Sequence, residues 1–130
     1  MTEAKQKFSV VHAEDGEFKG SGLRTQFEYR DLGINAATGG KYHAHVVRAA
    51  GGKPPIDAHT HNTIDFQLVY ILKGWMKFLY EGEGEVTAKT GSCILQPPGI
   101  KHTVLEWSDD LELLEVTSPG EFSTEMLAAE

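Results

Sequence analysis

The sequence has very few cysteines. Cys93 is its only one, so no internal disulfide can form, which agrees with a reducing compartment. Because Cys93 lies in the apolar stretch SCILQ, we expect it to be a small buried hydrophobic residue.

Long hydrophobic runs are also missing. The N-terminal stretch MTEAKQKFSVVHAEDGE lacks the apolar run of about 7–15 residues that a secretory signal needs. Runs elsewhere fall short of the ~20 apolar residues of a membrane-spanning helix. We therefore expect a cytoplasmic protein without a membrane partner.

Basic residues are a minority. Lys and Arg number 12 against 19 Asp and Glu, and the formal net charge is −7. Binding to nucleic acid requires clustered Lys and Arg to neutralise phosphates, so we expect no nucleic-acid partner.

What the chain does contain is a regular series of short apolar segments separated by glycine and proline. A length of 130 residues fits one domain, and we expect residues 1–130 to form it. Segments of this kind, rich in Val, Ile, Phe and Tyr, predict an all-β sandwich or barrel. The expected strands are 8–13, 24–32, 41–49, 57–61, 66–74, 75–81, 84–90, 92–97, 101–108 and 111–118.

The C-terminal tail GEFSTEMLAAE has a different pattern. Ser123 can cap a helix, and good helix formers follow it. We expect a short C-terminal helix.

Three histidines carry the pattern that indicates chemistry. His59 and His61 are one residue apart, so in a strand both imidazoles project to the same face. Gln67 begins a later strand, and the turn in PPGIKH leads to His102. Three imidazoles and one oxygen ligand would suit Fe, Ni, Zn, Mn or Cu.

These segments resemble the two motifs of the cupin superfamily. The first motif (59–74) has the His-x-His pair, and six residues separate Gly74 from the position of the family's glutamate. The second motif (91–106) matches at Gly91, Pro97, Gly99 and His102, whereas Glu106 stands where asparagine is common.

The resemblance implies a small single-domain cupin: a double-stranded β-helix, or jelly-roll barrel. It further implies that His59, His61, residue 67 and His102 surround a divalent metal ion. Chain-end strands such as 8–13 often help cupins to dimerise, so a homodimer is expected.

The sequence departs from the family at the fourth ligand. Counting back from Gly74 gives Gln67, whereas counting forward from His61 gives Asp65. We prefer Gln67 because a continuous strand fixes the facing direction, whereas a loop absorbs an extra residue. An amide leaves the ion with one more net positive charge than a carboxylate would, which weakens metal binding but favours an anionic ligand.

A second His-x-His pair, His43 and His45, is expected to consist of partly exposed strand residues, because no motif supplies a third ligand. Asp65 and Glu106 are the available acid/base candidates.

The resemblance leaves three functions open. One is a mononuclear metal-dependent enzyme, of dioxygenase or isomerase type, acting on a small oxygen-bearing metabolite. The others are a module that binds or senses a small molecule, and a metal-free structural cupin. Fold alone does not choose among them.

Overall fold

The structure is a computed structural model that describes residues 6–20, 26–52, 56–60, 63–120 and 125–126, with the backbone alone at 57–60 and 125–126. These residues include a 3-10 helix η1 (Ala13–Asp15) and a helix α1 (Ile34–Ala37). The strands are β1 (Lys19–Gly20), β2 (Phe27–Asp31), β3 (His43–Ala49), β4 (Ile56–Thr60), β5 (Phe66–Lys73), β6 (Trp75–Tyr80), β7 (Gly84–Lys89), β8 (Cys93–Leu95), β9 (His102–Trp107), β10 (Glu112–Ser118) and β11 (Glu125–Met126).

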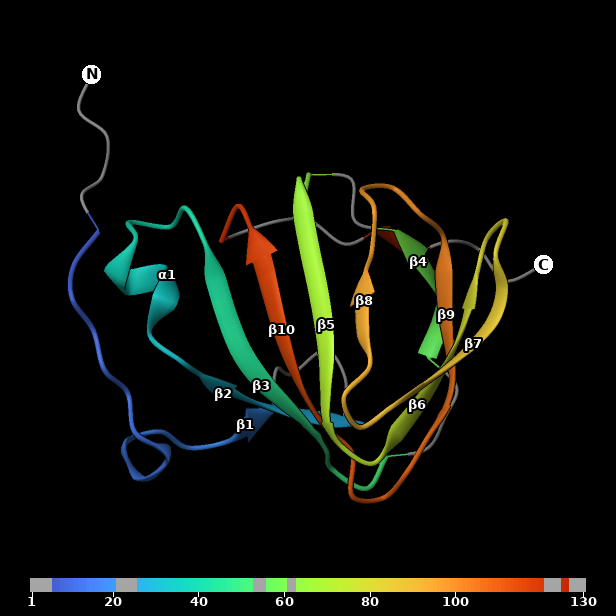
Figure 1. Ribbon diagram of the computed structural model, residues 1–130, viewed down its shortest axis with the longest axis horizontal. Helices are drawn as coiled ribbons and strands as arrows, with labels where there is room; N and C mark the ends of the chain where they lie inside the picture. The colour runs from blue at the N-terminus through green and yellow to red at the C-terminus, as the bar shows by residue number, and fades with distance from the viewer. Residues whose placement is uncertain (1–5, 21–25, 53–55, 61–62, 121–124, 127–130) are drawn as a thin grey trace.

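The strands form two antiparallel sheets that face each other (Figure 1). One sheet has the order β1-β2-β3-β10-β5-β8 and the other β11-β4-β9-β6-β7. Strand β10, near the end of the chain, lies between β3 and β5. This order confirms the expected all-β jelly-roll barrel.

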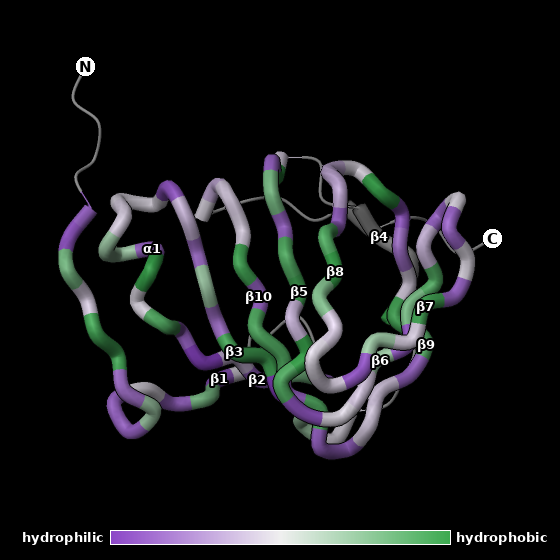
Figure 2. The backbone as a smooth tube through the Cα atoms, viewed as in Figure 1, coloured by the Kyte–Doolittle hydropathy of each residue, from purple (hydrophilic) through white to green (hydrophobic). Residues whose placement is uncertain are grey.

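An apolar core fills one end of the space between the sheets. Val47, Leu113 and Ile71 lie opposite one another on β3, β10 and β5, and all three are buried. Burying one such side chain contributes about 1.5–3 kcal/mol. Hydrophobic residues gather where the lower ends of β3 and β10 converge, whereas the upper part of β3 is hydrophilic (Figure 2).

Most of the strand predictions are confirmed, but the N-terminal one is wrong. Residues 6–12 form no strand, and Phe8 is 94% exposed. The edge of the sheet beside β2 is instead occupied by the short β1, so the segment that contains Phe8 gains no ladder of hydrogen bonds.

The expected C-terminal helix is also corrected where the structure describes the tail. Glu125 and Met126 form β11, which pairs with Thr60 and His59 of β4. An open strand edge offers the backbone a ladder of hydrogen bonds, which here outweighs helix propensity. Neither α1 nor η1, the helices in the described ranges, could cross a membrane.

The expectation for Cys93 is likewise wrong, since its side chain is exposed. It lies opposite Tyr70, which is also exposed. Alternation along β8 therefore turns Cys93 to the outer face.

The first-motif glycine permits a tight connection between β5 and β6. Gly74 has φ +75°, and a Cβ there would overlap Ser108 Oγ and lie 2.6 Å from Asp110 Oδ1. The same Ser108 hydroxyl accepts a 2.9 Å hydrogen bond from the Trp75 N–H.

We predict that Gly74→Ala lowers the free energy of unfolding by about 2–4 kcal/mol, through backbone strain and the displaced Ser108 hydroxyl. Gly82→Ala is the matched control, because Gly82 has φ +81° but open space around its Cβ position. It should lose only the ~1–2 kcal/mol of strain. Urea unfolding measures both, and equal losses would contradict the steric argument.

Candidate functional site

Buried polar side chains line the part of the barrel interior that adjoins the apolar core at Tyr80. We call this region the polar end. Gln67 lies on β5 and Gln96 directly follows β8, both in the first sheet, whereas Tyr80 and His102 lie on β6 and β9 of the second. All four side chains are buried. The backbone N–H of Gln96 donates to the backbone carbonyl of Gln67 at 2.9 Å. The Tyr80 hydroxyl donates to the side-chain oxygen of Gln96, Oε1. The Tyr80 ring lies 5.8 Å from that of His102, so these contacts connect both sheets.

His102 is held in a defined orientation. Its Nδ1 lies 3.2 Å from the Ile100 carbonyl, which can only accept a hydrogen bond, so we assign the proton to Nδ1 and the lone pair to Nε2. Ligand histidines commonly use such a backbone contact to fix their tautomer.

The two histidines of the first motif lie largely outside the described residues. The backbone of His59 pairs with that of His102 between β4 and β9. The side chain of His59 and all of His61 are outside the description.

Gln67 and Asp65 differ clearly in orientation. Gln67 is 3% exposed and faces the interior, whereas the Asp65 side chain is exposed. Asp65 precedes β5, and its N–H donates to the Ser118 carbonyl at 2.7 Å. This orientation favours the assignment anchored on Gly74, and the ligand role of Gln67 stays a prediction.

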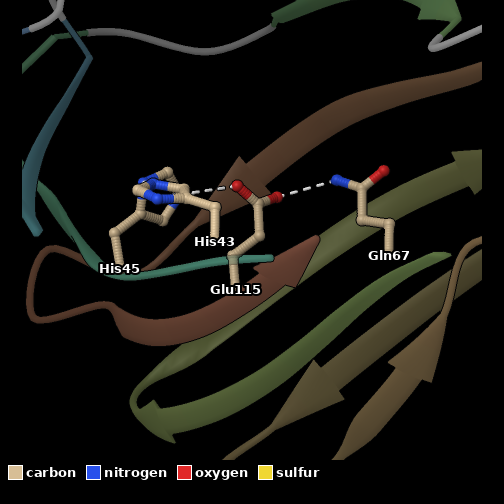
Figure 3. Close-up of polar contacts among 4 residues, drawn as sticks. All are labelled: His43, His45, Gln67 and Glu115. Carbon is tan, nitrogen blue, oxygen red and sulfur yellow. Dashed lines mark hydrogen bonds and ion pairs between the residues drawn. The ribbon is translucent and has the colours of Figure 1, made fainter. Parts of the chain in front are cut away.

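A hydrogen-bonded row crosses three strands toward Gln67 (Figure 3). His43 Nε2 lies 3.0 Å from His45 Nδ1, and His45 Nε2 lies 2.7 Å from Glu115 Oε1. The other carboxylate oxygen, Oε2, accepts from Gln67 Nε2 at 2.8 Å. Glu115 thus lies between the second His-x-His pair and the predicted fourth ligand.

The sequence analysis missed Glu115, although a signal was present. In LELLEVTS, Leu113, Glu115 and Thr117 share one strand face, and both Leu113 and Thr117 are buried. A glutamate on such a face indicates an interior partner. The expected partial exposure of His43 and His45 is confirmed, but their hydrogen bonds to each other and to Glu115 were not foreseen.

Burial changes the ionisation of two groups. Desolvation lowers the pKa of His43, and a positive charge on His45 lowers it further, while Asp31 and Glu115 act in the opposite direction. Desolvation raises the pKa of Tyr80 far above its usual value, and the charge of Glu115 adds to this. Tyr80 therefore remains a protonated hydrogen-bond donor.

A pocket of about 720 Å³ lies beside the histidine end of this row. Tyr29, Asp31, His43 and His45 contribute to its lining, together with parts of residues 11–20. This volume is within the usual range of small-molecule sites. Neither Gln67 nor His102 is among the lining residues.

The proposed acid/base candidates do not lie in the interior. Both Asp65 and Glu106 are exposed. Among the described residues, no three His, Cys, Asp or Glu side chains are arranged to hold a metal ion. The side chains of His59 and His61 are not among those described.

Comparison with solved structures gives similar folds. The polyketide cyclase RemF from Streptomyces resistomycificus has a TM-score of 0.75 at 16% identity, covering 95% of this chain and 88% of that chain. KdgF from a Halomonas species has a TM-score of 0.71 at 16% identity, covering 87% and 94%. An RmlC-like cupin from Shewanella frigidimarina has a TM-score of 0.61 at 16% identity, covering 88% and 94%. At these identities the likeness shows the fold alone.

Among curated protein sequences, none matches the chain significantly. A family model described as the cupin domain matches residues 44–117, which is more than half of the chain. This range begins in β3 and ends in β10, and so includes both sequence motifs and the strands that carry the polar row. The chain therefore belongs to the cupin family.

Proposed function

We propose that this cupin binds one divalent metal ion, of Fe, Ni, Zn or Mn, and uses it as an enzyme of dioxygenase or isomerase type on a small oxygen-bearing metabolite. The observation that carries the proposal is the polar end of the barrel. There Gln67 and His102, on opposite sheets, are buried and connected through Gln96 and Tyr80.

Two described residues at this end carry donor atoms of the kinds that such a metal ion binds. The assigned tautomer of His102 places its lone pair on Nε2, and the Gln67 amide offers an oxygen. His59 and His61 would complete the ligand set, and His59 lies opposite His102 in the strand register. When bound, such an ion supplies Lewis acidity toward an oxygen atom of the substrate.

The surrounding residues would shape the reaction. Tyr80, kept protonated by burial, donates a hydrogen bond to Gln96 Oε1 and so holds the Gln96 side chain in place. Tyr80 also belongs to the buried apolar core cluster, and apolar surroundings of this kind strengthen electrostatic interactions.

A module that binds a small molecule without turnover is the alternative. The pocket of about 720 Å³ favours it, because its lining includes His43 and His45 but neither Gln67 nor His102. Oxygen consumption or substrate isomerisation that depends on added metal would support the enzyme, whereas ligand binding without any turnover would support the module.

We also propose a homodimer. Phe8 and Val10, which are 94% and 56% exposed on a segment outside both sheets, offer apolar surface for a second copy.

The first prediction concerns metal content. Untagged protein purified without chelators and loaded with each metal should hold about one ion per chain by elemental analysis. His59→Ala/His61→Ala should lose the ion and retain the β-sheet circular dichroism spectrum. The matched control, His43→Ala/His45→Ala, removes the other His-x-His pair and should keep one ion at saturating metal. An unchanged ion content in the first variant would contradict the site assignment.

The second prediction separates the two candidates for the fourth ligand. Gln67→Ala should weaken Zn(II) binding about tenfold or more, because it removes an inward-facing oxygen. Asp65→Ala should leave the affinity unchanged, since the Asp65 side chain is exposed. Competition with a chromophoric chelator measures both, and the reverse order of effects would assign Asp65 as the ligand.

A further inference from the structure

The cupin pattern places a glutamate at position 67, and this chain has an amide there instead. A carboxylate nevertheless lies one hydrogen bond away, since Glu115 Oε2 is 2.8 Å from Gln67 Nε2. The two residues come from neighbouring strands, β10 and β5, and occupy diagonal positions on the inner face.

We propose that Glu115 is a positioning residue for the metal site. Its carboxylate holds the Gln67 amide with the oxygen turned toward the site, and it supplies from the next shell the negative charge that a glutamate at position 67 would supply directly. This inference rests on the proposed function.

The orientation of the amide follows from the chemistry of its partner. An ionised carboxylate can only accept hydrogen bonds, so the NH2 group of Gln67 must face Glu115. The amide oxygen then points away from Glu115 (Figure 3). An amide without this contact could present either end to a metal ion, and only the oxygen is a ligand.

The other side of Glu115 is fixed in the same way. His45 Nε2 faces the acceptor-only Oε1 at 2.7 Å, so His45 carries its proton on Nε2. His45 Nδ1 then accepts from His43 Nε2. Every donor in the row therefore points toward the carboxylate, and the row holds Glu115 in place.

The negative charge of Glu115 also acts on the opposite sheet. Its side chain is only 20% exposed, and its charge contributes to the raised pKa of Tyr80 on the opposite sheet. A carboxylate so little screened by water can offset part of the charge of an ion bound beside Gln67.

The contact between Gln67 and Glu115 changes the effect expected of Gln67→Glu, the substitution that restores the family's residue at this position. Gln67→Glu alone would place two carboxylates opposite each other at the 2.8 Å contact. Gln67→Glu combined with Glu115→Gln restores the two hydrogen bonds that link position 115 to His45 and to position 67. The new amide at position 115 donates to the carboxylate at 67 and accepts from His45 Nε2.

The test uses four variants of the full chain, with Zn(II) as the probe. The affinity for Zn(II) is measured by competition with a chromophoric chelator, and the thermal midpoint of the metal-free protein by circular dichroism. Glu115→Gln should bind Zn(II) about 10–100-fold more weakly, as is typical for loss of a next-shell partner. Gln67→Glu should lower the metal-free midpoint by about 5 °C or more. The double variant should recover that midpoint and bind Zn(II) at least as tightly as the unmodified protein.

Glu83→Gln is the matched control, because it removes the same charge from the exposed turn after β6 and should change neither measurement. Equal Zn(II) affinity in Glu115→Gln and the unmodified protein would overturn this inference and leave the metal site standing. If the metal-free double variant has no higher thermal midpoint than Gln67→Glu, the proposed pairing of residues 67 and 115 is overturned. This comparison remains valid even if Glu115→Gln alone fails to fold. Absence of Zn(II) binding that depends on His59 and His61 would overturn the proposed function and this inference with it.

Discussion

The interior of this barrel depends on the register between β10 and its two neighbours. Paired residues of adjacent strands face the same side of a sheet, so β10 determines what meets β3 and β5 inside the barrel. At one end this register aligns Val47, Leu113 and Ile71 in the apolar core. At the other end it places Glu115 between His45 and Gln67. A slip of one residue would turn Glu115 to the outer face and abolish both contacts.

Burying polar groups is costly unless they are hydrogen-bonded, and the polar end largely meets this requirement. Tyr80 bonds Gln96, and Glu115 accepts from both sides. Two buried atoms of the described residues, His43 Nδ1 and Thr117 Oγ1, have no hydrogen-bond partner. Each costs about 1–3 kcal/mol, so this part of the interior, which contains the row and its neighbour Thr117, is maintained at some expense in stability. That expense is consistent with a functional role for this end of the barrel.

The exchange of the motif glutamate for Gln67 has a different meaning once Glu115 is considered. By its sequence alone, the chain carries a neutral amide where the family pattern has a carboxylate. In the structure the negative charge is retained within one hydrogen bond of Gln67. Under the proposed ligand set, Glu115 would make the site less electron-poor than three imidazoles and an amide alone, while the directly coordinating groups would remain neutral.

The sequence by itself determined the strands from β2 to β10 and the inward direction of Gln67, because period-two alternation is a local property. It also indicated the cupin family, through the spacing of two motifs. Only the tertiary structure decided the surroundings of Gln67. Glu115 contacts partners 48 and 70 residues away in the chain, and no local pattern encodes such a pairing. The same holds for both ends of the chain: residues 6–12 and β11 have local preferences, but the availability of a sheet edge decides whether each becomes a strand.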